Sequence, residues 1–389
     1  MATFDFDTTI ERRGSDSIKW ARYAGRDVLP LWVADMDFAV PPAVQDALHR
    51  RIDHGVFGYA EPWPALIKAV QDHLQRHYGW RIEPSWLVWI PGVVAALNVA
   101  CRAVGEIGDG VFTSTPVYPP FLFSPELSAR RLITAPLVRA AQRWEFDFAA
   151  VDQKLDQARL WLLCHPHNPV GRAWEADELH EIARLAQKHD LVVCSDEIHC
   201  GLMLDEKRHH QPFAALSEDA AQRSITLMAP SMTFNLPGLY CAFAVIPNAA
   251  LRKNFLRVMD GIMPHANIMG LVATESAYRD CDDWRLALID YLRGNARLVE
   301  DAVAQMPGLK MTPVEATYLA WIDCRELCDT HHIENAQRFF EAAGVGLSSG
   351  ADFGLAGDYS KFVRLNFGCP RSTLEEALRR MASANPDQV

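Results

Sequence analysis

The sequence predicts an α/β protein with a mostly parallel sheet in a large domain and a smaller α+β domain beside it. Short apolar runs alternate with stretches of helical periodicity, and parallel strands need such helices as crossovers. The runs end at polar, proline or glycine residues, as strands buried on both faces do. These predicted strands lie at residues 87–90, 111–113, 160–164, 191–194 and 225–228.

Helices are predicted between these strands. Apolar residues recur at helical spacing within residues 175–189, between two of the strands. A turn at Gly92 leads from the strand at 87–90 into an apolar helix around residues 95–100. In sheets built from strand–helix–strand units, ligands bind beyond the carboxyl ends of the strands. We therefore expect the functional residues in the loops that follow the strands.

The C-terminal third has a different pattern. A long helix is predicted over residues 282–305, followed by strands at 317–322 and 362–367 with a helix at 333–343 between them. The loop-rich N-terminal residues would complete this smaller unit. The predicted division is a large domain of residues 46–285 and a small domain of residues 1–45 plus 286–389.

Composition excludes several classes of protein. The 389 residues are 49% hydrophobic and 22% charged, which is ordinary for a globular protein. No apolar run reaches the ~18 residues of a membrane span, and the acidic N-terminus does not resemble a secretory signal. A net charge of −11 without a Lys/Arg cluster argues against nucleic-acid binding. The nine cysteines show no paired spacing, so we expect reduced thiols and a cytoplasmic location.

Two loops carry candidate ligand-binding groups. Val93 and Val94 follow Gly92 at a helix start, where free N–H groups and the helix dipole attract anions, although such turns also occur as simple connections. The loop 165–172 is either a rigid proline-rich turn or a segment that directs Asn168 into a site. Its two histidines have no evident third ligand nearby, so we expect no metal.

A third loop begins at the end of the strand at 191–194. Asp196 is either a helix cap at the strand exit or a carboxylate of the site. His199 either tunes Asp196 or is a satisfied core histidine. Each loop alone is weak evidence for a binding site, and only their order along the chain points to a particular family.

That order resembles the fold-type I pyridoxal-phosphate (PLP) enzymes of aminotransferase class I/II. The resemblance is completed by residues 228–239, Met-Ala-Pro-Ser-Met-Thr-Phe-Asn-Leu-Pro-Gly-Leu, which resemble the loop that anchors the cofactor. The chain further resembles the cystathionine β-lyase (cysteine-S-conjugate β-lyase) branch, with the similarity extending over about residues 3–380. The segments that carry this second resemblance are 30–38, 57–59, 115–121, 196–200 and 364–371.

The resemblance implies a binding site for pyridoxal 5′-phosphate. Its phosphate would be bound by the backbone N–H groups of Val93 and Val94 and by the Ser231 hydroxyl. Tyr59 would reach the phosphate of the neighbouring subunit, so the active site would need a homodimer.

The resemblance also implies contacts to the cofactor's ring. Tyr118 would stack on the pyridine ring, and Asn168 would donate a hydrogen bond to the phenolate oxygen. Asp196 would pair with the protonated pyridine nitrogen, which keeps the ring an electron sink. His199 would lie beside Asp196 in the same cofactor site.

The substrate would be held by Arg364 and Ala34. Arg364 would bind the substrate's α-carboxylate in a bidentate fork, and its apolar strand favours a buried anionic partner. Ala34 lies in the branch-specific segment at 30–38.

The chain departs from the family at Met232. In the family this position holds the Schiff-base lysine, which also removes the Cα proton and protonates the leaving sulfur. Methionine has a similar length but no amine. A deliberate change, a natural loss that leaves a pseudoenzyme, and a sequence error are the three explanations. The other implied ligands are retained, which favours an engineered or recent loss: Asp196, Asn168, Tyr118, Ser231 and Arg364.

The resulting hypothesis is a homodimeric C–S lyase that is inactive with Met232. Its lysine-bearing form would perform α,β-elimination on cystathionine or other cysteine-S-conjugates, releasing a thiol, pyruvate and ammonia. One alternative is an aminotransferase of class I/II, which returns the amine to a keto acid. The other is a non-catalytic PLP-fold protein that binds amino-acid ligands or a regulatory partner.

Overall fold

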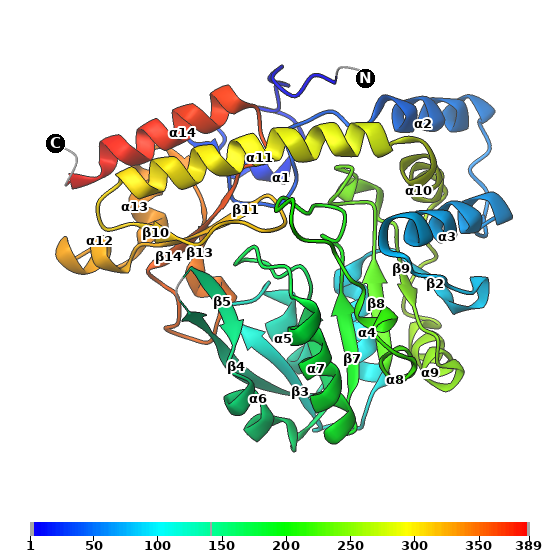
Figure 1. The fold of residues 1–389 in the computed structure, drawn as a ribbon. Helices are drawn as coiled ribbons and strands as arrows, with labels where there is room; N and C mark the ends of the chain where they lie inside the picture. Colours follow the sequence, from blue (N-terminus) through cyan, green and yellow to red (C-terminus); the bar gives the residue numbers. More distant parts are fainter. Residues whose placement is uncertain (1–3, 141, 387–389) are drawn as a thin grey trace.

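A central eight-stranded sheet organises the structure, a computed structural model that describes residues 4–140 and 142–386 (Figure 1). The inner strands β8, β7, β6, β3 and β4 are parallel, whereas β2, β9 and β5 run antiparallel to their neighbours. The α/β class and the mostly parallel sheet are thereby confirmed. In sheet order the strands are β2 (Leu87–Ile90), β9 (Ala242–Val245), β8 (Ser224–Met228), β7 (Val192–Asp196), β6 (Ala158–Cys164), β3 (Gly110–Thr115), β4 (Arg131–Ala140) and β5 (Arg143–Phe146).

Helices cover both faces of this sheet. Leu160 and Leu162 of β6 pack into the apolar cluster that includes α4, whereas Trp161 and Leu163 pack into the cluster that includes α7. Both faces of β6 are therefore buried, which explains its uninterrupted apolar sequence. The helices before and around the sheet are α2 (Pro42–His54), α3 (Pro64–Tyr78), α4 (Val93–Ala103), α5 (Pro120–Leu127), α6 (Phe148–Leu155), α7 (Ala176–Lys188), α8 (Glu218–Gln222), α9 (Ala249–Met259) and α10 (Ile268–Asp280).

The C-terminal part forms a second, antiparallel sheet. Its strand order is β10 (Lys310–Met311), β11 (Leu319–Asp323), β14 (Phe362–Asn366) and β13 (Ser348–Ser349). The helices of this part are α11 (Asp282–Gln305), α12 (Arg325–Thr330), α13 (Ala336–Ala342) and α14 (Arg371–Ala384). In Figure 1, α11 and α14 run side by side along one edge of the molecule, and Asn295 of α11 donates hydrogen bonds to the carbonyls that precede α14.

The N-terminal segment joins this C-terminal part. Strand β1 (Leu29–Pro30) pairs in parallel with β12 (Val345–Gly346), and α1 (Ile18–Ala21) precedes it. This pairing agrees with the expected association of the two chain ends, although the predicted domain boundaries remain a prediction. Four short 3₁₀ turns complete the elements: η1 (Pro84–Trp86), η2 (Phe213–Ala215), η3 (Pro237–Leu239) and η4 (Gly350–Phe353).

Two predicted elements differ in extent. The strand expected at 317–322 begins only at Leu319, because Thr317 has a left-handed backbone with φ of 74° that cannot continue a strand. The helix expected at 333–343 is limited to α13, and the separate helix α12 before it was not predicted. Strands β4, β5 and β9 of the central sheet were not predicted either.

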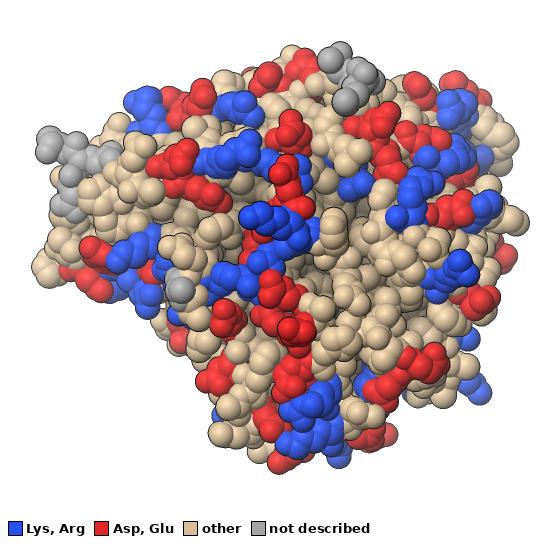
Figure 2. All heavy atoms as spheres, viewed as in Figure 1, with Lys and Arg blue, Asp and Glu red and all other residues tan. Residues whose placement is uncertain are grey.

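The surface and the cysteines are unexceptional. Lys and Arg side chains are interspersed with Asp and Glu over the face shown in Figure 2. Within the two described ranges, no helix combines the length and the apolar character that crossing a membrane requires. All nine cysteines are free and buried.

Candidate active site

The predicted site residues lie where the central strands end. Asp196 is the last residue of β7, and it pairs in register with Cys164 at the end of β6 and with Leu227 of β8. Asn168 follows β6, and Met232 follows β8. Parallel strands present their carboxyl ends at one edge, so the fold brings these loops together.

Asp196 is a buried carboxylate without a cationic partner. It is 4% exposed, and one of its oxygens accepts a hydrogen bond from the Ile198 N–H at 3.1 Å. No Lys, Arg or His among the described residues forms an ion pair with it. Burial raises the pKa of Asp196 to about 7, with a smaller contribution from Glu197. Such a group is stabilised by a cationic ligand.

Arg364 is a buried guanidinium without an anionic partner. It is 5% exposed and lies on β14, with its guanidinium carbon 4.9 Å from the centre of the Phe353 ring. It donates to the Trp32 carbonyl at 2.8 Å, and its Nε has no partner. No carboxylate of the described part of the chain pairs with it. Burial lowers the pKa of Arg364 to about 10. The site therefore holds an unpaired cation as well as an unpaired anion.

Arg364 also fixes the orientation of Asn168. Its Nη1 donates to the Asn168 Oδ1 at 2.9 Å, and the Asn168 carbonyl accepts from the Tyr118 N–H at 3.1 Å. The side-chain oxygen is therefore occupied, which leaves the amide N–H groups of Asn168 without an acceptor among the described residues. A ligand oxygen would satisfy them.

Tyr118 and His199 lie in the electric field of these groups. Burial raises the pKa of the Tyr118 phenol, Arg364 lowers it and Asp196 raises it, which places this ring near both charges. His199 is buried, and burial followed by the nearby Arg364 lowers its pKa to about 3, so the ring is neutral. Its Nδ1 has no hydrogen-bond partner. This unpaired atom is a second group that a ligand oxygen would satisfy.

The start of α4 is an open anion site. Gly92 is its N-cap and provides no side-chain hydrogen bond, so the N–H groups of Val93 and Val94 have no intrahelical acceptor. Ser231 is buried in the turn after β8. These groups together fit the phosphate, ring oxygen and pyridinium nitrogen of PLP.

Met232, Ala34 and Tyr59 complete the predicted set. Met232 is half-buried, and its sulfur lies 3.3 Å from the hydroxyl oxygen of Tyr318. The Tyr318 hydroxyl also donates to the Ala34 carbonyl, so Ala34 lies close to position 232. Tyr59 is fully exposed in the loop between α2 and α3 and contacts none of these groups within one chain.

Sequence reasoning did not single out Glu197. This fully buried carboxylate accepts hydrogen bonds from the Ser195 hydroxyl (2.9 Å), the Phe213 N–H (2.9 Å) and His210 (2.7 Å). Burial raises its pKa to about 7. His210 stacks on His165, with ring centres 4.4 Å apart. These contacts therefore connect the end of β7 to the segment at residues 210–213. In the sequence, only the two adjacent acidic residues at 196–197 could have indicated this buried hydrogen-bond network.

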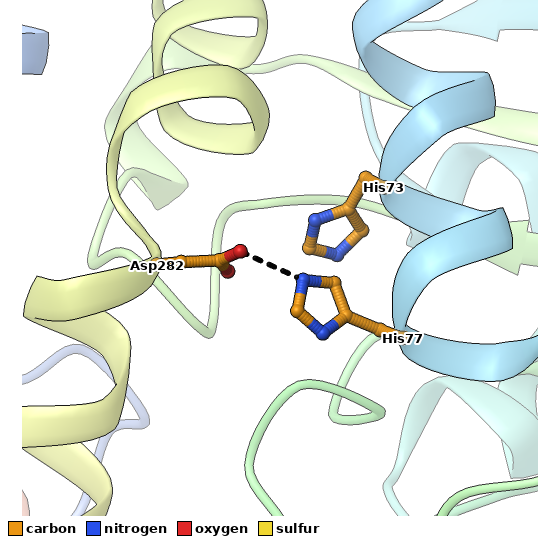
Figure 3. A group of neighbouring side chains, drawn as sticks. All are labelled: His73, His77 and Asp282. Atoms are coloured by element: carbon orange, nitrogen blue, oxygen red, sulfur yellow. Dashed lines mark hydrogen bonds and ion pairs between the residues drawn. The ribbon is translucent and has the colours of Figure 1, made fainter.

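A histidine cluster outside the site was also missed. His73 and His77 on α3 face Asp282 at the start of α11, and His77 bonds to Asp282 at 3.0 Å (Figure 3). Arg76 and Arg285 contact the same carboxylate at 2.9 and 3.4 Å. Burial would raise the pKa of Asp282, but the bonds from His77 and the arginines lower it overall. Two guanidinium groups disfavour a metal cation there, so the cluster serves to tie α3 to α11.

The unpaired state of Asp196 predicts a pH-dependent stability. Its folded pKa of about 7 exceeds the ordinary value of 3.8, so the folded state binds more protons between these values. Stability should therefore fall as pH rises from about 4 to about 7 and stay reduced above that. Cofactor-free Asp196→Asn should be more stable than the parent protein at pH 8, by at most about 4 kcal/mol. Thermal melts at pH 4.5 and 8 test this, and an advantage that does not shrink at pH 4.5 would contradict it.

Comparisons with known proteins show what the whole chain is similar to. The family model described as aminotransferase class I and II matches residues 26–381. Cystathionine beta-lyase PatB of Bacillus subtilis (strain 168) is 37% identical over 98% of this chain and 99% of its own. The crystal structure of OvoB is 46% identical, with a TM-score of 0.94 over 98% of this chain and 99% of that chain. Cystalysin from Treponema denticola, whose crystal structure contains pyridoxal 5′-phosphate, is 32% identical, with a TM-score of 0.93 over 100% of both chains.

Proposed function

The chain belongs to the aminotransferase class I and II family, and we propose that it is a PLP-dependent C–S lyase whose catalytic lysine is replaced by Met232. The lysine-bearing form performs α,β-elimination on cystathionine or another cysteine-S-conjugate. The observation that carries the proposal is the coexistence of an unpaired Asp196 and an unpaired Arg364 in one buried site. An amino acid bound to PLP supplies a carboxylate that pairs with Arg364 and a pyridinium that pairs with Asp196.

The chain's own groups bind the cofactor at both ends. Val93 and Val94 donate backbone N–H groups to the phosphate, together with the Ser231 hydroxyl. The N–H groups left free on Asn168 donate to the ring oxygen, and the unpaired Nδ1 of His199 is available to the same ligand. When bound, PLP supplies an electron sink for the electrons left at Cα.

Three side chains act on the ring and the substrate. Tyr118 stacks on the ring, and Asp196 keeps the pyridine nitrogen protonated. Arg364 holds the α-carboxylate, and the hydrogen bonds from its guanidinium to Asn168 and Trp32 fix the direction of its remaining N–H groups.

A lysine at position 232 moves the protons of the elimination. It takes the proton from Cα, the Cβ–S bond breaks, and the sulfur leaves as a thiolate that receives a proton. The remaining three-carbon enamine takes up water and yields pyruvate and ammonia. Met232 has no amine and performs neither proton transfer. Release of thiol and pyruvate from cystathionine by the Met232→Lys protein tests the proposal.

A homodimer completes the site. Residues 55–63 form an irregular loop that exposes Val56, Phe57 and Tyr59 by 62%, 57% and 109%. Apolar side chains clustered on one loop are typical of a contact surface. Tyr59 of one subunit reaches the phosphate in the site of its partner. A protein that stays monomeric by light scattering in the presence of PLP would contradict this proposal.

Met232 itself favours a second candidate, a non-catalytic protein that binds PLP–amino-acid ligands. The aminotransferase alternative differs in needing a keto acid, so pyruvate release without one separates it from the lyase. The family fold and the buried free thiols support a reducing cytoplasmic compartment for either activity.

The absence of an amine predicts weak retention of the cofactor. PLP bound to the Met232 protein has no covalent attachment, so it should be removed by dialysis within the time in which Met232→Lys keeps most of it. Cofactor absorbance per protein chain after dialysis is the measurement. Equal retention by both proteins would show that position 232 does not anchor the cofactor.

A further inference from the structure

Tyr318 lies against position 232 without a role assigned to it so far. It is 1% exposed and immediately precedes β11. Its hydroxyl donates to the Ala34 carbonyl, and the same oxygen lies 3.3 Å from the Met232 sulfur. The edge of its ring faces His199, with ring centres 6.0 Å apart. A buried hydroxyl thus contacts position 232, where the family resemblance implies a lysine.

The backbone around Tyr318 is held firmly. Thr317 has a φ of 74°, a region that β-branched residues rarely adopt. Its N–H donates to the Leu202 carbonyl at 2.9 Å, and its hydroxyl accepts from the Leu319 N–H at 3.2 Å. The Tyr318 carbonyl accepts from the Phe367 N–H at 2.9 Å. Uncommon backbone conformations that are kept by several contacts cluster at functional sites.

The acceptor of the Tyr318 proton is equally fixed. Asn366 donates to the carbonyls of Val33 (2.6 Å) and Asp35 (2.9 Å), on either side of Ala34. A hydroxyl has one proton, and here that proton is committed to Ala34. Toward position 232 the Tyr318 oxygen therefore presents lone pairs only, and it can serve that position as an acceptor.

A lysine at 232 would supply the matching donor. The methionine Sδ occupies the place of the lysine Cδ. In lysine, one further carbon, Cε, leads from Cδ to the amine nitrogen Nζ. Because Sδ is already 3.3 Å from the Tyr318 oxygen, the lysine chain would pass this oxygen and its amine would lie within reach. The Met232 thioether cannot donate a hydrogen bond, so in this chain the Tyr318 oxygen receives none from position 232.

We propose, on the basis of the proposed function, that Tyr318 is a positioning residue for the amine of a lysine at position 232. Its oxygen accepts a hydrogen bond from that amine while its own proton is donated to the Ala34 carbonyl. The amine is thereby held near Ala34 between its proton transfers. The other charged groups that act on Tyr318 are Asp35 and Arg364, and both remain in a Tyr318→Phe variant.

The test uses full-length, cofactor-free Met232→Lys protein with and without Tyr318→Phe. Acetic anhydride labelling of residue 232, followed by peptide mass spectrometry over a pH series, gives the pKa of the amine. Losing an acceptor destabilises the ammonium form, so Tyr318→Phe should lower this pKa by about one unit. An unchanged pKa would overturn the proposal.

Tyr23→Phe is the matched control. This buried tyrosine lies against Glu341, with its hydroxyl 3.5 Å from the carboxylate, and should leave the labelling unchanged. In the PLP-loaded enzyme, Tyr318→Phe should lower kcat about 10- to 100-fold with KM nearly constant, as expected for lost orientation. A rise in KM alone would contradict a positioning role. The labelling experiment needs no turnover, so it decides on Tyr318 even if cystathionine is not a substrate.

Discussion

Replacing Met232 with lysine should create β-elimination activity that the Met232 protein lacks. The reason is that the other groups that we propose for the site are in place, including the unpaired and buried Asp196 and Arg364. General acid–base catalysis alone contributes typically ~10²–10⁴-fold, and the lysine also attaches and releases the cofactor. We therefore expect at least such a gain in thiol and pyruvate release from cystathionine.

The control for this experiment is Met232→Gln. Glutamine is about as long as methionine and has a polar end group, but it has no basic amine. It should remain as inactive as the Met232 protein. Comparable rates in the Met232 and Met232→Lys proteins would show that this amine is not the catalytic group. If neither is active, a screen of amino acids with and without keto acids separates a different substrate from a non-catalytic protein.

Changing Asp196 to asparagine in the Met232→Lys protein should nearly abolish elimination while leaving the fold intact. An amide cannot stabilise a protonated pyridine nitrogen, so the electron sink at the Cα-deprotonation step is lost. The ion pair between Asp196 and the pyridinium would also be stronger than an ion pair on the surface, because the effective dielectric constant is lower in a buried site. Steady-state kcat for pyruvate release is the measurement, with thermal melts to verify folding.

This substitution separates a structural role of Asp196 from a pairing with the pyridine nitrogen. The Asp196 side chain accepts a hydrogen bond from the Ile198 N–H, but residues 198–201 form a turn and no helix begins there, so the helix-cap alternative is wrong. A purely structural Asp196 would serve only this turn, and the side-chain oxygen of asparagine can accept the same hydrogen bond, so such a residue would tolerate the change. Near-normal turnover in the double variant would therefore refute the assignment to the pyridine nitrogen.

The centre of the fold could be predicted because of how it is buried. Strands β6 and β7 pack against helices on both faces, so their sequences are continuous apolar runs that stand out from their neighbours. Three candidate residues, Asn168, Asp196 and Met232, lie at or shortly after the ends of such strands, so their place at one edge of the sheet also followed from the sequence. The roles of these residues came from family resemblance and remain proposals.

Other features could not be predicted, because they depend on contacts between distant segments. Strand β4 alternates between buried and exposed residues near the sheet edge, so its pattern is weak. The left-handed backbone of Thr317 is held in part by the hydrogen bond from its N–H to the carbonyl of Leu202, which is distant in sequence. Likewise, Tyr318 and Met232 meet although they are 86 residues apart. No local periodicity encodes that contact.

The most direct test of the central claim is to locate the covalent bond to the cofactor. The Met232 and Met232→Lys proteins are each incubated with PLP, reduced with borohydride, digested and analysed by mass spectrometry. We predict a PLP adduct on residue 232 of the lysine variant and no stoichiometric adduct on any lysine of the Met232 protein. A stoichiometric adduct on another lysine, in either protein, would contradict the claim that position 232 is the anchoring position of this site.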